Sequence, residues 1–245
     1  MILNYLYDGS FEGLLTSIYE AYYRRENPVD IVSKEKRENN FLIDYIYIKT
    51  DADKFDKVYK AIDRKISSEV LRRIFYCYLS ELPKSGKMIL EYIRLGFKIG
   101  YKVDEHLAND IIREVNNIYK KVSRERHRML GLIRFKEIEG GVLYASIEPD
   151  HNIISLLAPH FSRRMRGEKW IIHDIKRSIA VIYSDGDWNI RDIGMNSSIS
   201  IREEEEEYQD LWKTYFSAIS IEGRTNQKLQ KNHMPKRYWK HLVEK

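Results

Sequence analysis

The sequence contains one cysteine in 245 residues, Cys77. A single cysteine excludes an internal disulfide, a Cys-rich zinc site and an iron–sulfur cluster held by cysteines. Because Cys77 lies in the apolar run Ile74–Leu79, we expect an unreactive thiol buried in a core rather than a nucleophile.

Long apolar runs are also missing. No stretch approaches the roughly 20 apolar residues that a membrane-spanning helix requires. The first four residues lead directly into the polar turn Asp8-Gly9-Ser10, and they lack the pattern of a signal peptide. We therefore expect a cytoplasmic protein with no membrane partner.

The common nucleotide and metal motifs do not occur. The sequence has no GxGxxG, no Walker lysine motif, no HExxH and no paired CxxC. These patterns carry dinucleotide, nucleoside-triphosphate and zinc sites, so their absence argues against all three. We expect no cofactor and no bound metal.

What the sequence does contain is an uneven distribution of charge. The net charge is +5 and the pI is about 9.0, which favours a polyanionic partner. Lys120–Lys136 and Arg224–Lys245 each carry seven Lys or Arg against one Glu, and the acidic run Glu203–Glu207 offsets them. The 18 tyrosines suit both core packing and a wet contact surface.

Hydrophobic periodicity predicts the secondary structure. A strand over Leu3–Tyr7 is followed by the N-cap Ser10 and a helix over Phe11–Arg24, and glycine turns at 139–141 and 185–186 predict hairpins. The other predicted strands are Phe41–Lys49, Leu130–Ile138, Val142–Ile147, Trp170–Ile175, Ser178–Tyr183 and Trp188–Ile190. The other predicted helices are Asp51–Lys65, Glu69–Leu82, Lys87–Gly96, Glu105–Arg126, Ile153–Arg166 and Glu203–Phe216.

This order of elements predicts an α+β protein with antiparallel sheet elements, a helical middle and a helical, basic carboxy-terminal segment. We expect one domain over residues 1–245, with the helices of 51–118 as a subdomain.

Basic residues gather where the predicted helix Glu105–Arg126 ends. They are Arg124, Arg126, Arg128 and Arg134, with His127 among them. Guanidinium groups hold phosphate with two hydrogen bonds and stack on bases, so this segment is a candidate nucleic-acid site. The alternative is a solvated helix end, where cations are favoured by the helix dipole.

A second group lies on the predicted helix Ile153–Arg166 and on the strand that follows. His160, Arg163 and Arg164 belong to the helix, and His173 and Asp174 belong to the strand. If His127, His160 and His173 converge, they form with Asp174 a general acid/base set, or they bind a metal, although their spacing matches no metal motif. The alternative is that each histidine is a hydrogen-bonded structural residue.

The amino-terminal turn is a third candidate. Asp8, Ser10 and Glu12 lie where a glycine turn meets the first amides of a helix, which is a geometry suited to an anion. The two acidic side chains argue against phosphate, so a structural turn with its helix cap is the alternative.

The basic carboxy-terminal stretch interleaves cations, amides and aromatics. Cations neutralise phosphates, aromatic rings stack on unpaired bases, and amides read base edges. The compatible alternative is a tail that docks its aromatic residues onto the core of the protein. The candidate nucleic-acid-binding residues of this stretch are Arg224, Asn226, Lys228, Gln230, Arg237, Tyr238, Trp239 and Lys240.

Taken together, these stretches resemble a family described as probable DNA metabolism proteins. The landmarks are Tyr-Asp-Gly-Ser-Phe-Glu-Gly-Leu-Leu at 7–15, His-Arg…Arg-Phe at 127–135, His-Phe…Arg at 160–164, Trp-Ile-Ile-His-Asp at 170–174, Leu-Trp…Tyr-Phe at 211–216, Arg-x-Asn-x-Lys-Leu-Gln at 224–230 and Pro-x-Arg-Tyr-Trp at 235–239. Members occur beside a putative radical-SAM protein of DNA repair or modification, and some resemble the amino-terminal half of fusions to a uracil-DNA glycosylase-like domain.

The resemblance implies a partner rather than a mechanism, because the family has no established catalytic residues. The leading hypothesis is a DNA-binding accessory protein that handles single-stranded or distorted DNA for a radical-SAM or glycosylase partner. One alternative is a DNA-processing hydrolase or lyase that uses His127, His160, His173 and Asp174. Another is a protein adaptor that docks its partner through the helix at 203–216.

Overall fold

The computed structural model describes residues 2–193, 204–219 and 226–243. The chain divides into two compact units, Met1–Ser123 and Arg124–Lys245, and the helix α5 (Asp110–Leu132) contributes residues to both. The α+β class that the sequence predicts is confirmed, as is the helical middle. The single domain that we expect over 1–245 stays a prediction.

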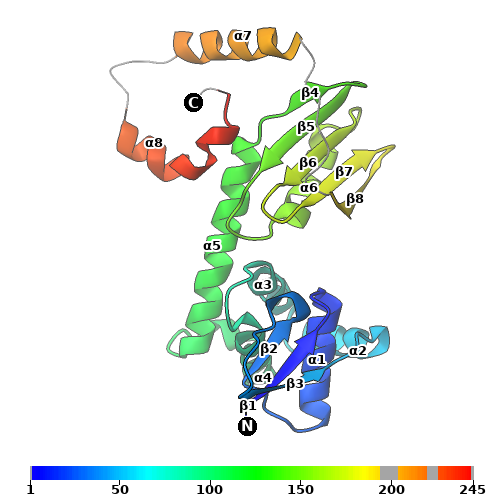
Figure 1. The fold of residues 1–245 in the computed structure, drawn as a ribbon. Helices are drawn as coiled ribbons and strands as arrows, with labels where there is room; N and C mark the ends of the chain where they lie inside the picture. Colours follow the sequence, from blue (N-terminus) through cyan, green and yellow to red (C-terminus); the bar gives the residue numbers. More distant parts are fainter. Residues whose placement is uncertain (1, 194–203, 220–225, 244–245) are drawn as a thin grey trace. The chain divides into compact units, whose positions relative to one another are not determined.

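The first unit is built on a three-stranded parallel sheet. β1 (Ile2–Tyr7) lies between β2 (Asp30–Ser33) and β3 (Ile43–Tyr47), and it runs parallel to both (Figure 1). The sequence pattern did not indicate β2 or the parallel pairing. Parallel strands need a crossover connection, which α1 (Phe11–Tyr23) provides between β1 and β2.

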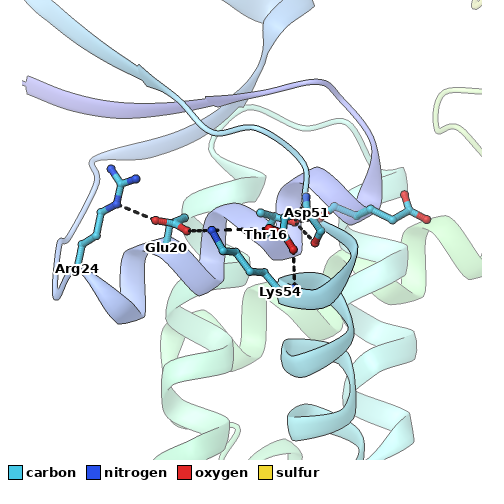
Figure 2. Close-up of polar contacts among 6 residues, drawn as sticks. Thr16, Glu20, Arg24, Asp51 and Lys54 are labelled. Atoms are coloured by element: carbon cyan, nitrogen blue, oxygen red, sulfur yellow. Dashed lines mark hydrogen bonds and ion pairs between the residues drawn. The ribbon is translucent and has the colours of Figure 1, made fainter.

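Helix α1 begins where the sequence predicts. The hydroxyl of Ser10 accepts a hydrogen bond from the Gly13 amide at 2.9 Å, which satisfies one of the free amides of the first turn. Figure 2 shows how α1 contacts the next helix, α2 (Ala52–Lys65). The buried carboxylate of Glu20 accepts hydrogen bonds from Arg24 and Lys54, each at 2.7 Å. These bonds, that from Lys54 above all, hold the pKa of Glu20 below its usual value.

Helices α3 (Ser68–Leu79), α4 (Ser85–Ile99) and the first part of α5 complete the first unit. Ser67 caps α3 by accepting from the Val70 amide at 3.2 Å. Cys77 is buried in α3, and burial raises the pKa of its thiol to about 12. The expected burial of this thiol is therefore confirmed, and the raised pKa disfavours the reactive thiolate.

The second unit contains a five-stranded mixed sheet. The strands are β4 (Lys136–Ile138), β5 (Val142–Ile147), β6 (Trp170–Asp174), β7 (Ile179–Ser184) and β8 (Asp187–Asp192), in that order across the sheet. β5 and β6 are parallel and joined through α6 (Ile154–Arg164), while the other pairs are antiparallel. The hairpins predicted at the two glycine turns are both present, and Gly140 and Gly186 adopt the positive φ that such turns require.

The two faces of this sheet differ in character. Trp170 stacks on Tyr183 and packs against Phe161 of α6, so we call this side the helix face. Because successive side chains of a strand point to opposite sides, His173 lies on the other side. The 3-10 helix η4 (Lys236–His241) contacts β5 on that side, which we call the tail face. In Figure 1, α6 lies against the sheet in the second unit.

Two predictions in this unit were wrong in their bounds. The hydrophobic pattern predicts a helix that ends at Arg126 and a strand that begins at Leu130, whereas α5 continues to Leu132 and β4 begins only at Lys136. Glu125, Met129 and Leu132 are buried on one side of the helix, so packing extends it past the basic segment.

The remaining elements are α7 (Glu204–Ala218) and α8 (Gln227–His233). The first confirms the helix predicted over Glu203–Phe216 but continues to Ala218, and residue 203 lies outside the described residues. The second was not predicted, and Asn226 caps it by accepting from the Leu229 amide at 2.9 Å. Among the helices that the structure describes, none has the length and apolar character needed to span a membrane.

Candidate functional site

Three predicted nucleic-acid-binding arginines surround His160. Arg126 projects from α5 and donates from Nε to the Leu156 carbonyl of α6 at 3.0 Å, while Arg163 and Arg164 are exposed on the last turn of α6. Within the described ranges, no carboxylate forms an ion pair with any of the three arginines. We call Arg126, His160, Arg163 and Arg164 the arginine cluster.

The pKa of His160 reflects the burial of its ring and the positive charge of this cluster. Burial, followed by the charges of Arg164, Arg126 and Arg163, lowers the pKa of His160, so the ring is neutral at neutral pH. Its Nε2 is buried without a hydrogen-bond partner among the described residues. An anion that reached this point would meet three cations that no carboxylate of the described chain neutralises.

The other predicted cations of this region lie elsewhere. Arg124 and His127 are exposed on α5, and Arg128 is half-buried. Arg134 donates to the Gly131 carbonyl at 2.8 Å, and its guanidinium lies 5.8 Å from the ring centre of Trp212. Arg134 is therefore held against α7 rather than presented with the cluster.

The structure does not bring the four predicted catalytic side chains together. His160 lies on α6, which covers the helix face, whereas His173 points to the tail face. Asp174 follows His173 in β6 and therefore points away from it. His127 is exposed on α5. These side chains share no reacting atom in this arrangement, so the acid/base set proposed from the sequence is not formed.

Asp174 has a structural partner instead. It is fully buried, and its Oδ2 accepts from Nη1 of Arg177 at 2.8 Å. Arg177 also donates to the carbonyls of Pro149 at 3.1 Å and Asp150 at 2.9 Å. The pair thus fixes the segment that follows β5.

The carboxy-terminal stretch docks onto the rest of the second unit. Tyr238 is 1% exposed and donates its hydroxyl to the buried carboxylate of Glu125. Burial, followed by this hydrogen bond, raises the pKa of Tyr238 well above its usual value. Two ion pairs flank it, Arg237 with Asp150 at 2.6 Å and Lys240 with Glu148 at 2.6 Å. In this arrangement, the ring of Tyr238 cannot stack on a nucleobase.

The remaining predicted residues of this stretch have local roles or are exposed. Trp239 donates from Nε1 to the Met234 carbonyl at 2.8 Å, and Asn226 is the cap of α8. Lys228 is exposed and Gln230 is half-buried on α8. Arg224 lies outside the residues that the structure describes.

The amino-terminal turn is held by its own hydrogen bonds. Oδ1 of Asp8 accepts from the amide of Ser10 at 2.9 Å and from its hydroxyl at 2.6 Å, and Oδ2 accepts from Thr50 at 2.7 Å. Although partial burial acts to raise it, these bonds hold the pKa of Asp8 below its usual value. A Cβ on Gly13 would lie 2.3 Å from Oδ1 of Asp8, which explains the glycine. Glu12 is exposed in the first turn of α1. The geometry is that of a turn joined to a helix cap.

The tail face carries a polar cluster that the sequence analysis missed, apart from His173. Tyr144, Ser146 and Glu148 lie on one side of β5 and the residue after it, and His241 comes from η4. The hydroxyl of Tyr144 lies 2.9 Å from Nδ1 of His173, and Oγ of Ser146 lies 3.1 Å from Nδ1 of His241. The alternate spacing of 144, 146 and 148 predicts a shared face, but no local pattern predicts a partner 95 residues away.

Both histidines of this cluster have a lowered pKa. Burial lowers the pKa of His173, and Asp174 opposes this only in part. Burial also lowers the pKa of His241; Glu148 opposes the shift, while Lys240 and Lys136 add to it. Each imidazole is therefore neutral at neutral pH and has a nitrogen able to accept a proton. Across the described parts of the chain, no group of three or more His, Cys, Asp or Glu side chains is placed to hold a metal ion.

A search of curated proteins finds no match to the chain. One family model does match, over residues 83–244, which is more than half of the sequence. The match includes the arginine cluster, the tail-face cluster and the docked carboxy-terminal stretch, and its family is described as a domain of unknown function. The chain therefore belongs to the DUF4130 family.

Proposed function

We propose that the protein is a DNA-binding accessory protein of a DNA repair or modification system, acting with a radical-SAM or glycosylase partner. The resemblance to DNA metabolism proteins supports DNA as the ligand and supports the partner. Within the second unit, the arginine cluster supports the binding of a polyanion.

The observation that carries this proposal is the contrast between two sets of cations. Arg237 and Lys240 are each neutralised by a carboxylate of the same chain, at 2.6 Å in both cases. Arg163 and Arg164 are exposed and have no such partner among the described residues. Cations without internal partners release counterions from a phosphate backbone when they bind it.

The test is the salt dependence of binding to a single-stranded oligonucleotide, followed by fluorescence anisotropy. Replacing Arg163 and Arg164 by glutamine should weaken binding and reduce the slope of log affinity against log salt concentration by about 1.4, since each phosphate contact contributes about 0.7 on single strands. The matched control replaces Lys65 and Lys98, two exposed lysines of the first unit, and removes the same charge.

Three results would contradict the proposal. These are an absence of binding by the unmodified chain, an affinity independent of salt, and an equal loss in the control variant. Arg237 and Lys240 are unsuitable probes of charge alone, because replacing either also breaks an ion pair that holds the tail.

One observation favours a second function, the docking of a protein partner on α7. Tyr208, Leu211, Tyr215 and Ile219 follow helical spacing, and between 55% and 66% of each is exposed. Exposed apolar stripes of this kind mark interaction surfaces. If the radical-SAM protein binds here, it should co-purify with the chain after nuclease treatment. The double variant Leu211→Ser with Tyr215→Ser should abolish co-purification. The control variant Thr214→Ala should retain it. Retention of the partner by the double variant would contradict this role.

A further inference from the structure

Ser146, His241 and Glu148 form a continuous line of polar atoms on the tail face. Ser146 and Glu148 are two residues apart, so both project from the same side of the chain at β5. His241 reaches them from η4: Nδ1 lies 3.1 Å from Oγ of Ser146, and Nε2 lies 3.6 Å from Oε1 of Glu148. A hydroxyl, an imidazole and a carboxylate in this order have the arrangement of an activated nucleophile.

A second hydroxyl–imidazole pair lies directly beside this line. His173 is the register partner of Ser146 across the parallel strands β5 and β6, and its Nδ1 lies 2.9 Å from the hydroxyl of Tyr144. Across the sheet, the register partner of His173 on β7 is the small residue Ala180, and the partner of Ala180 on β8 is Arg191. These residues lie on the same face of the sheet as Ser146. The two pairs therefore face a common part of the sheet.

Cations border this part of the tail face. Lys136 is the register partner of Tyr144 and is close enough to His241 to influence it, and within the described residues it forms no ion pair. Arg191 lies at the other end of this set of register partners and donates only to Asn189, at 3.0 Å, among the described residues. Cations on two sides of a nucleophile suit a substrate that carries negative charge, such as a phosphate ester.

We propose that Ser146 is a nucleophile toward phosphate esters, that His241 accepts its proton, and that the charge of Glu148 stabilises the protonated His241. Nothing in this inference depends on DNA binding by the arginine cluster, which lies over the helix face.

The chemical step balances with these groups alone. The Oγ–H proton of Ser146 moves to Nδ1 of His241 as the Oγ–phosphorus bond forms and the bond from phosphorus to the ester oxygen breaks. The departing alkoxide takes the proton back from Nδ1. Water then attacks the phosphoserine and gives a proton to Nδ1 as the bond between Oγ and phosphorus breaks. The Ser146 alkoxide takes this proton back from Nδ1, which releases phosphate and restores the hydroxyl and the neutral imidazole. Throughout, Oε1 of Glu148 lies 3.6 Å from Nε2 of His241, too far for a hydrogen bond in this arrangement, and its negative charge stabilises the imidazolium.

The protonation states agree with these roles. His241 is neutral at neutral pH because of burial and the nearby Lys240 and Lys136, against the opposing charge of Glu148. A neutral ring is the form that accepts a proton. Glu148 keeps its place through a second contact, since Nζ of Lys240 lies 2.6 Å from the same oxygen.

A fluorophosphonate probe tests the inference on the full chain. The probe presents phosphorus with fluoride as leaving group, so an activated serine forms a stable Oγ–phosphorus bond whether or not its natural substrate is known. We expect mass spectrometry to place the adduct on Ser146 and Ser146→Ala to lose it. Ser162→Ala is the matched control, because the hydroxyl of Ser162 only contacts its own helix at the Pro159 carbonyl, and it should label normally.

The role of His241 needs readouts that a structural hydrogen bond would not affect. His241→Gln should slow labelling by roughly 100-fold or more, while far-UV circular dichroism and the thermal transition show whether the tail stays docked. In the unmodified chain, the labelling rate should rise with the deprotonation of His241, below pH 6.5, and level off by neutral pH. An unlabelled Ser146 overturns the proposal. So does a rate that climbs in proportion to hydroxide up to alkaline pH, since His241 would then not be the base.

Discussion

Glu125 is a carboxylate buried in α5, and its oxygens accept hydrogen bonds from three donors. These are the amide of Asp150 at 2.7 Å, the amide of His151 at 2.9 Å and the hydroxyl of Tyr238. The donors come from two segments far apart in the sequence. One side chain thus fixes both the segment after β5 and the docked tail.

Replacing Glu125 by alanine should lower the free energy of unfolding by about 3 kcal/mol, because buried donors left without an acceptor cost about 1 to 3 kcal/mol each and some of them regain water. Urea denaturation followed by tryptophan fluorescence measures this, since all four tryptophans lie in the second unit. Glu114→Ala, at an exposed position of the same helix, should change stability by less than about 0.5 kcal/mol. Equal stability of the two variants would show that the three hydrogen bonds contribute nothing.

The candidate site was only partly predictable from the sequence, because several of its contacts join segments that are far apart along the chain. His160, Arg163 and Arg164 share a helix, so their proximity follows from local spacing. The contacts of Glu125 with Tyr238 and of Ser146 with His241 join residues about a hundred positions apart, and no local pattern specifies them. Because His173 and Asp174 are adjacent in β6, strand alternation places them on opposite faces of the sheet.

At the scale of elements, local patterns predicted most helices and both hairpins. β5 was predicted with its observed bounds, and α1 ends one residue earlier than predicted. The short strand β2 was missed, because its four residues include the polar Asp30 and Ser33. The parallel pairing of β1 with β3 depends on the crossover through the helices and is a tertiary property.

Helix α4 approaches β2 so closely that its first turn requires glycine. A Cβ on Gly86 would lie 2.1 Å from the Ile31 carbonyl oxygen and 2.9 Å from the Ile31 Cβ. Gly86→Ala should therefore lower the free energy of unfolding of the first unit by about 2 kcal/mol through overpacking.

The matched control is Gly131→Ala. An added Cβ there meets nothing within 4 Å, and the residue lies in the last turn of α5. This change should raise stability by about 0.5 to 1 kcal/mol, because alanine loses less conformational freedom in a helix than glycine. Urea titrations followed by far-UV circular dichroism measure both variants. A neutral or stabilising Gly86→Ala would contradict the close approach of α4 to β2.

At the scale of the whole molecule, each unit has its own sheet and its own buried side chains. Ile74 of α3 is fully buried in the first unit, and Ile172 of β6 is fully buried in the second. α5 contributes residues to both units, so the energetic coupling between them is open to measurement. The expectation of one domain over 1–245 predicts full coupling, whereas separate cores favour weak coupling.

The energetic coupling between the two units can be measured in one chain, because two spectroscopic signals report on different parts of it. Tryptophan fluorescence reports the second unit alone, because no tryptophan precedes Trp170, while far-UV circular dichroism reports the helices of both units. Ile74→Ala should cost about 2 to 5 kcal/mol and lower the urea midpoint of the dichroism signal. If the two cores unfold separately, this variant leaves the fluorescence midpoint nearly unchanged, and Ile172→Ala lowers it. Equal shifts of both signals in both variants would instead show that the two units unfold as one cooperative domain.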